Sequence, residues 1–475
     1  LQYTSLKNLI PKPYGNFTDI WEIELYNKSV FFRSHDMIFE FNNDAIKVYN
    51  ATSGWLYMKL AGNKLIAQDK TQGIFQFINN GWQPLISQIS IPDFEITGIV
   101  DLNNDSLLIS TLLNGLYILS NGKLIKKNIS SNDIFSKTHI YSFEKINNSE
   151  YVAGTTSEGC VVINTNGQIV QQIARPEGLQ NNNVLCVFLD RDKNLWAGLD
   201  NGISFIAYNA AIKFIKPGKP NDLSGYSARI FNDQLYIATS DGTYTVSLQS
   251  AIKDLSFSKG EFELIKNSGG QNWRLDEVNH QLLLAHNSGS FLIQNKEAIQ
   301  LTQGGCWLFV PTASVFPSKN VMLGTYNGLN IFNFDGNKYL NNTILKGINE
   351  SLRFLSIDNN NTIWASHPYR GVYKIQLSAD SKSFSSELFT DKDGLPSTFR
   401  NNVFRIKNRV VFATEKGVYE YDSSIKKFKP SPLLFNVFGN MVLQYLAEDA
   451  EGNIWFCSDK KIGVVSFKEN LHHIT

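Results

Sequence analysis

The stretch from Val184 to Ile203, VLCVFLDRDKNLWAGLDNGI, decides the fold. An apolar run is followed by an Asp-rich turn, then by a second apolar run that begins at Leu195-Trp196, and finally by Gly202 and a third apolar run. Short apolar runs separated by Asp, Asn and Gly are typical of strands in an antiparallel meander. We therefore expect three consecutive strands here, with Gly202 allowing a positive φ or a close backbone approach between the second and third strands.

The same pattern recurs along the whole chain. Strong copies occupy 355–373 and 446–465, weaker copies keep only the second strand, the glycine and the third strand, and a degenerate first copy at 30–40 has no glycine. The marker glycines are Gly73, Gly115, Gly159, Gly202, Gly242, Gly289, Gly328, Gly371, Gly417 and Gly463. They recur about every 43 residues, which is the spacing of a four-stranded propeller blade.

The fold class predicted from this repeat is all-β. We expect tandem β-propellers of four-stranded antiparallel blades, about eleven blades of about 43 residues. The recurring Trp196, Trp364 and Trp455 are predicted to pack between neighbouring blades.

Eleven blades require more than one ring, because propellers close with about four to eight blades. The best boundary is the segment 210–224, which contains Pro217 and Pro220 and has no strand pattern. We therefore predict a first propeller over 1–215 with about five blades, and a second over 216–475 with about six blades.

Composition excludes several classes of protein. Lys and Arg number 44 against 43 Asp and Glu, so the net charge of +1 argues against a nucleic-acid binder that relies on a basic field. No apolar run of about 18 residues is present, so no membrane-spanning helix is predicted within the chain. The four cysteines, Cys160, Cys186, Cys306 and Cys457, lie in apolar runs and are predicted to be buried small hydrophobic residues, with disulfides as the alternative.

Catalytic and metal signatures are missing from the sequence. The seven histidines form no His-Glu-x-x-His motif, and no Gly-x-Ser-x-Gly elbow occurs. Asp190 to Asn194 has the spacing of a calcium loop, but Leu195 and Asn201 replace the required glycine and glutamate, so an Asp-capped turn is favoured. We predict no catalytic residues, no metal site and no cofactor, and keep a lyase or glycosidase with carboxylates from different blades as an alternative.

The pattern Asp-x-x-x-Asn-Leu-Trp-x-Gly from Asp190, completed by Gly202, resembles the two-component regulator propeller repeat. That family provides the extracytoplasmic sensor regions of hybrid two-component systems and of LuxR-type membrane-spanning regulators in Bacteroidetes. The resemblance implies two seven-bladed propellers, of which this chain would lack about two N-terminal blades and one C-terminal blade. It also implies a periplasmic location, and a membrane helix with a histidine kinase or helix-turn-helix output in segments absent from this chain.

A ligand site is expected where the innermost strands line the channel of the second propeller. Aligning the repeats places Arg229, Trp273 and Arg353 together with Trp21, Leu185 and Gln444, and the neighbouring residues Arg274, Trp307 and Arg400 lie close to this register. An aromatic face suits the apolar face of a sugar ring, and guanidinium groups capture carboxylate or sulfate. The predicted ligand-binding residues are Arg229, Trp273, Arg274, Trp307, Arg353 and Arg400. The alternative is that each Trp packs between blades and each Arg lies on the surface.

The function expected from these observations is ligand sensing without catalysis. The chain would bind a glycan-derived oligosaccharide and transmit the signal through a conformational change, with a homodimer as one expected form. A propeller enzyme and a protein-interaction propeller are the alternatives. Two buried carboxylates at a channel mouth would favour the enzyme, and an apolar mouth beside a large exposed apolar patch would favour the interaction module.

Overall fold

The structure is a computed structural model that describes residues 5–87, 89, 91–103, 106–128, 134–210, 213–217, 223–248, 254–257, 262–312, 319–378, 383–459, 461–468 and 471–474. The chain divides into two compact units. Unit 1 comprises Leu1–Lys216 and Ser250–Gly260, and unit 2 comprises Pro217–Gln249 and Glu261–Thr475. Each unit is described by itself.

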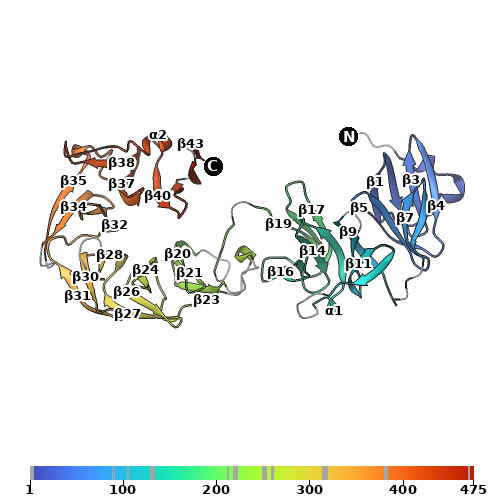
Figure 1. Ribbon diagram of the computed structural model, residues 1–475, viewed down its shortest axis with the longest axis horizontal. Coiled ribbons are helices and arrows are strands. Elements are labelled where there is room, and N and C mark those ends of the chain that lie inside the picture. Colours follow the sequence, from blue (N-terminus) through green and yellow to red (C-terminus); the bar gives the residue numbers. More distant parts are fainter. Residues whose placement is uncertain are drawn as a thin grey trace. The chain divides into compact units, whose positions relative to one another are not determined.

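Unit 1 contains five antiparallel sheets, numbered here as blades 1 to 5 in chain order (Figure 1). Their strands are β1 (Glu22–Tyr26), β2 (Ser29–Arg33), β3 (Met37–Asn42) and β4 (Ala45–Asn50); β5 (Trp55–Ala61), β6 (Lys64–Asp69), β7 (Gly73–Ile78) and β8 (Gly81–Ile86); β9 (Ile96–Asn103), β10 (Ser106–Thr111), β11 (Gly115–Ser120) and β12 (Lys123–Lys126); β13 (Ile140–Lys145), β14 (Glu150–Thr155), β15 (Cys160–Asn164) and β16 (Ile169–Ile173); and β17 (Val184–Leu189), β18 (Leu195–Leu199) and β19 (Gly202–Ile206). The helical elements are short, namely η1 (Lys7–Leu9), η2 (Lys12–Tyr14), α1 (Ile134–Lys137) and η3 (Leu255–Phe257).

Unit 2 contains six four-stranded sheets, blades 6 to 11, whose first strands face the middle of the arc in Figure 1. Their strands are β20 (Gly225–Phe231), β21 (Gln234–Thr239), β22 (Thr243–Ser247) and β23 (Glu263–Leu264); β24 (Asn272–Val278), β25 (Gln281–His286), β26 (Gly289–Gln294) and β27 (Glu297–Gln303); β28 (Cys306–Pro311), β29 (Val321–Thr325), β30 (Gly328–Phe334) and β31 (Tyr339–Leu345); β32 (Phe354–Ile357), β33 (Ile363–His367), β34 (Gly371–Leu377) and β35 (Phe384–Phe389); β36 (Asn402–Ile406), β37 (Arg409–Thr414), β38 (Gly417–Asp422) and β39 (Lys427–Pro430); and β40 (Leu443–Glu448), β41 (Ile454–Ser458), β42 (Ile462–Lys468) and β43 (Leu471–Ile474). The helical elements are η4 (Asp391–Asp393) and α2 (Phe435–Phe438).

The predicted fold class is therefore confirmed. Eleven sheets follow one another along the chain, and ten of them have four strands. Blade 5 departs from the prediction, because its sheet comprises only β17, β18 and β19 within the described residues.

Tight turns join the strands of each blade. Asn232 and Asp233, between β20 and β21, have φ values of 48° and 55°, and Asn295 and Lys296, between β26 and β27, have values of 50° and 60°. Two successive positive φ angles define the hairpin turns whose twist matches that of the flanking strands, and Asn tolerates them well. Many of the Asn residues in the sequence therefore occupy hairpin turns, where they adopt a positive φ.

Two of the marker glycines combine a positive φ with a close backbone approach, but the approach is to the fourth strand and not between the second and third strands as predicted. Gly371 opens β34 with φ of 106°, and a side chain there would collide with the backbone oxygen of Phe389 on β35. Gly73 opens β7 in the same way, with φ of 93° and the oxygen of Ile86 in the path of a side chain. At these positions only glycine allows the third and fourth strands to approach as they do.

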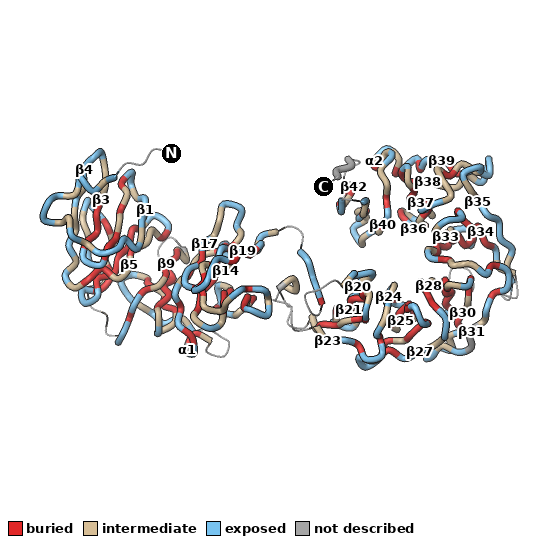
Figure 2. The backbone as a smooth tube through the Cα atoms, turned by 180° about the vertical axis from the view of Figure 1, so that it is seen from behind, coloured by how far each residue is buried: buried red, intermediate tan, exposed pale blue. Residues whose placement is uncertain are grey.

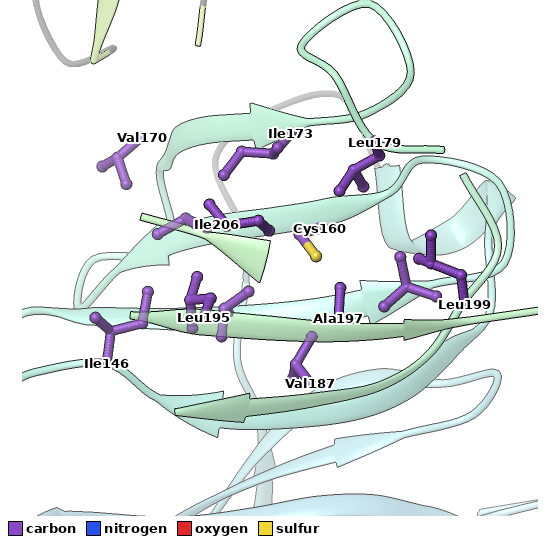
Figure 3. Packing of buried hydrophobic residues seen from close by; sticks show 13 residues of the cluster. Ile146, Cys160, Val170, Ile173, Leu179, Val187, Leu195, Ala197, Leu199 and Ile206 are labelled. Carbon is purple, nitrogen blue, oxygen red and sulfur yellow. The ribbon is translucent and has the colours of Figure 1, made fainter. Parts of the chain in front are cut away.

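The hydrophobic core of each unit is distributed between blades. The second strands β10, β14, β25 and β29 are buried almost throughout, whereas the outer strands carry many exposed residues (Figure 2). Figure 3 shows one layer, in which Cys160 and Ile173 of blade 4 pack against Val187, Leu195 and Ala197 of blade 5. Adjacent blades therefore stabilise one another through their broad faces.

The Asp-turn motif fixes a tryptophan in three blades. The Nε1–H groups of Trp196, Trp364 and Trp455 donate to the Oδ2 atoms of Asp190, Asp358 and Asp449 at 3.0, 2.9 and 2.9 Å. The Oδ1 atom of Asp190 also accepts the backbone N–H groups of Asp192 and Asn194, both at 2.9 Å. This carboxylate is engaged as a turn cap, as predicted, and the bonds from Asn194 and Trp196 lower its pKa.

Burial of these tryptophans depends on their blade. Trp364 is 3% exposed, because its ring packs against Phe412 and Phe428 of blade 10. Trp196 and Trp455 are 41% and 48% exposed. They lie in blades 5 and 11, the last of their units, where no later blade of the same unit covers them. The predicted packing between blades therefore holds for Trp364 alone.

Two further expectations have mixed outcomes. All four cysteines are free, and Cys160 and Cys306 are buried as predicted, but Cys186 is exposed because it also lies on blade 5. The first segment of unit 1 ends at Lys216, one residue from the predicted boundary between residues 215 and 216. Unit 1 also includes the segment Ser250–Gly260, which was not predicted. Within unit 1, the N–H of Asp254 donates to the side-chain oxygen of Gln171 at 3.0 Å, and its carboxylate pairs with Lys213 at 3.1 Å.

None of the helices in the described ranges has the length and hydropathy needed to cross a bilayer.

Candidate ligand-binding site at the mouth of unit 2

Irregular pairing at the start of the first strands creates the site. In β20, β24, β28 and β40 the register shifts after the first paired residue, which leaves Tyr226, Trp273, Trp307 and Gln444 without a partner on the second strand. Such bulges redirect side chains and are frequent beside binding sites. Arg353 has the corresponding place in blade 9, immediately before β32, and its N–H donates to the oxygen of Ser366 on β33 at 3.3 Å.

These residues surround a cavity of about 460 Å³. Its lining comes from the inner strands of blades 6, 7, 8, 9 and 11, and comprises Tyr226, Ser227, Ala228, Arg229, Trp273, Arg274, Leu275, Asp276, Trp307, Arg353, Phe354, Gln444 and Tyr445. The volume lies in the range of small-molecule sites. A ligand there would touch residues from five blades at once.

Aromatic rings form a continuous row along one side of the cavity. The ring centroids of Tyr226 and Trp273 are 5.0 Å apart, those of Trp273 and Trp307 are 4.9 Å apart, and those of Trp307 and Tyr326 are 4.6 Å apart. The indole N–H of Trp273 donates to the Tyr326 hydroxyl, and that of Trp307 donates to Ser351 Oγ, both at 2.8 Å. These bonds fix the orientation of the indoles, and neither indole is fully buried.

Three arginines add positive charge to the cavity, and among the residues that the structure describes only Arg274 of these three forms an ion pair. Arg274 Nε lies 2.9 Å from Asp276 Oδ1, and this carboxylate raises the pKa of the guanidinium. Asp276 is buried, and its Oδ2 accepts the backbone N–H of Phe309 on the next blade at 3.1 Å. The guanidinium carbon of Arg353 lies 5.0 Å from the Trp307 ring centroid, a cation–π contact. Arg229, on β20, is exposed to the cavity.

A second cavity, of about 550 Å³, continues the channel from these residues. It shares Arg229, Arg274, Asp276 and Tyr445 with the first, so the two cavities adjoin at these four residues. Its other lining residues are mostly apolar, for example Val278, Phe309, Val310, Leu355 and Val403. Arg405 also lines it, but donates to the oxygens of Ile357 and Asn359 at 2.5 and 2.6 Å.

The structure brings five of the six predicted site residues together, namely Arg229, Trp273, Arg274, Trp307 and Arg353. Arg400 does not line either cavity of the channel; it precedes β36 with φ of 54°, and its N–H donates to the oxygen of Pro368 at 3.3 Å.

The predicted alignment is wrong in blade 6. The bulged residue there is Tyr226, whereas Arg229 lies three positions further along β20, paired with Tyr236. β20 has seven residues, one more than β17 and β40, and ends in the two-residue Asn232-Asp233 turn, so counting back from the aspartate stops short of the bulge. Tyr226 was missed for this reason, and a count from the second strand would have identified it. Tyr445 lies in blade 11, directly after the correctly aligned Gln444, and was not singled out.

The corresponding positions of unit 1 have a different character. The residues skipped by the register shifts of β5, β9, β13 and β17 are Leu56, Thr97, Tyr141 and Leu185. None of these four is basic, and none is a tryptophan. Trp21 has the place in blade 1 that Arg353 has in blade 9, immediately before the first strand, and its N–H donates to the oxygen of Arg33 at 2.9 Å. The mouth cavity of unit 2 differs in that Trp273, Trp307 and Arg353 line it together from three neighbouring blades.

Unit 1 contains instead a cluster of charges between its inner strands. Lys59 Nζ on β5 lies 2.9 Å from Glu144 Oε1 on β13 and 3.9 Å from Glu24 Oε1 on β1. Burial raises the pKa of Glu24, although Lys59 opposes this effect. The two carboxylates share one ammonium group, an arrangement that holds three blades together and leaves neither carboxylate unpaired.

The fold and the mouth cavity define the class of this protein, a chain of two consecutive β-propeller units with an aromatic and basic site in the second. Its repeat is also identified. Residues 178–201 match the family described as two component regulator propeller, so the chain carries the repeat that its sequence resembled. No match was found among curated proteins.

Solved structures share the architecture. The extracellular domain of a protein described as the hybrid two component system BT3049 from B. thetaiotaomicron is 14% identical, with a TM-score of 0.53, over 95% of this chain and 76% of that one. The extracellular domain of the one component system BT4673 from the same organism is 13% identical, with a TM-score of 0.41, and the match covers 96% of this chain and 65% of that one. A virginiamycin B lyase from Staphylococcus aureus is 13% identical, with a TM-score of 0.38, and the match covers 53% of this chain and 84% of that one. The first comparison establishes the shared fold, and no inference rests on the other two.

Proposed function

We propose that this chain is the ligand-sensing region of an extracytoplasmic signalling receptor, located in the periplasm. Two observations support the proposal. The chain carries the two component regulator propeller repeat, and its fold is shared with an extracellular domain described as part of a hybrid two component system. A histidine kinase or a helix-turn-helix domain outside this chain would provide the output.

The ligand is an oligosaccharide bound at the mouth of unit 2. The observation that carries this proposal is the aromatic row of Tyr226, Trp273 and Trp307 beside Arg353 in a cavity of about 460 Å³. Indole faces suit the apolar face of a sugar ring, and the guanidinium, Gln444 and Ser227 offer hydrogen bonds to its hydroxyl groups. A purely apolar mouth would have favoured a protein-interaction propeller. The lining of this cavity instead includes arginines, Asp276, Ser227 and Gln444.

Signalling follows from the distribution of the contacts over several blades. A ligand that touches blades 6 to 9 and blade 11 binds best when their first strands have one particular spacing. Binding therefore favours the conformation with that spacing, by as much as the difference in affinity between conformations. We propose sensing and no catalysis for the chain itself, because the one acidic residue of the mouth cavity, Asp276, has both carboxylate oxygens bound within the protein.

Fluorescence of the tryptophans tests the oligosaccharide site. Titration of the chain with a panel of plant and host oligosaccharides should change the emission, because Trp273 and Trp307 line the cavity. The double variant Trp273→Ala/Arg353→Ala should abolish the saturable response. Trp455→Ala, which removes an exposed indole outside the cavity, is the matched control and should leave the affinity unchanged. Equal affinity of the double variant and the unaltered chain would refute the proposed site.

A further inference from the structure

We infer that the oligosaccharide carries a carboxylate or sulfate group, held at the mouth of unit 2 by Arg229 and Arg353. This inference rests on the proposed function and narrows its ligand class. It follows from the charges of the cavity, from their pairing and from the geometry of the two arginines.

The cavity has more positive than negative groups. Its lining contains three arginines, Arg229, Arg274 and Arg353, and a single acidic residue, Asp276. Asp276 is directed to Arg274 through Oδ1 and to the Phe309 N–H through Oδ2, so both of its oxygens are occupied within the protein. The chain as a whole has a formal charge of only +1, so this local excess is a property of the site.

The two remaining guanidinium groups carry the excess charge. Among the described residues, neither Arg229 nor Arg353 forms an ion pair with a carboxylate, whereas Arg33, Arg370 and Arg409 pair with Glu22, Glu350 and Glu420. Arg353 contacts only aromatic faces through its cation–π geometry, over Trp307 at 5.0 Å and over Phe354 at 5.9 Å. A guanidinium stacked in this way keeps its edge of N–H groups free to bind a planar acid group in a bidentate manner.

Arg229 marks the inner end of the site. It lines both cavities, as Arg274 and Asp276 also do. An anionic group bound there would lie where the two cavities adjoin, while the sugar ring that bears it rests against the aromatic row. Within the mouth cavity, a cationic ligand would meet these two arginines and no carboxylate other than the paired Asp276, and a neutral ligand would leave both charges without a partner. The exposed Glu277 lines only the second cavity.

Calorimetric titration of the full chain with three probes tests the inference: a galacturonic acid trisaccharide, a sulfated galactose trisaccharide without carboxylates and a neutral galactose trisaccharide. The account predicts that at least one acidic probe binds about 10- to 100-fold more tightly than the neutral one, because hydrogen bonds between charged groups are stronger. The carboxylate-only and sulfated probes distinguish the two acid groups. Affinity for the preferred probe should fall as sodium chloride is raised, since the contacts are partly exposed to solvent.

Variants test whether Arg229 and Arg353 cause the tighter binding of the acidic probe. Arg229→Gln and Arg353→Gln should each weaken the acidic probe about 10- to 100-fold and leave the weak binding of the neutral probe within about twofold. Arg229→Lys keeps the charge and should retain part of the affinity. Arg409→Gln, which removes a charge outside both cavities, is the control and should have no effect. Circular dichroism of each variant establishes that it is folded.

The outcomes separate this inference from the function on which it rests. If the neutral trisaccharide binds as tightly as both acidic probes and Arg229→Gln changes nothing, the inference is overturned and the oligosaccharide site stands. If neither acidic nor neutral probes bind, the proposed function falls and the inference falls with it.

Discussion

The pair formed by Asp358 and Trp364 shows how one residue type has two consequences in this fold. The carboxylate accepts turn N–H groups from Asn360 and Thr362 at 2.8 and 2.9 Å, and also the indole N–H of Trp364. The indole ring is then carried into the interface with blade 10. The sequence reveals the hydrogen-bonded pair wherever the motif occurs, but not whether a neighbouring blade covers the ring.

Replacement of Trp364 by alanine should therefore destabilise the protein strongly. Loss of a buried aromatic side chain costs about 3–5 kcal/mol of unfolding free energy. Trp455→Ala removes the same motif residue where it is half exposed, and should cost about 1 kcal/mol or less. Urea unfolding followed by far-UV circular dichroism gives both values, and equal losses for the two variants would contradict the assigned packing.

The cysteines should also differ in reactivity toward thiol reagents, because some of their thiol groups are buried and others are exposed. Burial raises the pKa of the Cys160 thiol to about 12 and that of Cys306 above its usual range, so at pH 8 both remain protonated as well as inaccessible. Cys186 is exposed. A thiol reagent at pH 8 should modify Cys186 in the native chain, and Cys160 and Cys306 only after denaturation. Mass spectrometry of the labelled peptides measures this order, and rapid native labelling of Cys160 would be inconsistent with the core between blades 4 and 5.

At the scale of the element, the repeat is visible in the sequence because each blade is a local meander. Apolar runs, two-residue Asn turns and marker glycines lie within about 43 residues of one another, so the number of blades and most strand positions follow from sequence. The bulges at Trp273 and Trp307 are not visible, because they arise from pairing with the second strand. This explains why five predicted site residues meet in one cavity while Tyr226 was missed and Arg400 lies elsewhere.

The glycine that opens the third strand should be sensitive to substitution. Gly371→Ala would add a side chain at φ of 106° and against the oxygen of Phe389, and should cost about 2–4 kcal/mol of unfolding free energy from strain and overpacking together. Gly81→Ala, at a strand start with open space and no positive φ, should change this free energy by less than about 1 kcal/mol. Thermal and urea unfolding of both variants provide the comparison; a neutral Gly371→Ala would show that the third strand does not depend on this glycine.

At the scale of the whole molecule, two units with the same blade architecture have different inner surfaces. The bulged positions of unit 1 carry Leu56, Thr97, Tyr141 and Leu185, and its inner strands are joined by the Lys59, Glu24 and Glu144 cluster. Unit 2 carries the aromatic and basic mouth. We therefore propose that unit 2 recognises the ligand.

Matched tyrosines at the bulged positions test this division. Tyr226→Ala should weaken oligosaccharide binding about 10-fold, because Tyr226 lies against Trp273 in the cavity. Tyr141→Ala removes the bulged tyrosine of unit 1 and should leave affinity unchanged. Calorimetric titration of both variants distinguishes the units; a larger loss in Tyr141→Ala would place the site in unit 1.

The central claim is that the mouth of unit 2 binds an oligosaccharide, and a crystal structure of the chain with a tightly bound acidic oligosaccharide tests it most directly. The account predicts a sugar ring against the Trp273 and Trp307 row, with its acid group at hydrogen-bond distance from Arg229 or Arg353. A sugar bound outside the cavity lined by these residues, with the mouth of unit 2 holding only solvent, would contradict it.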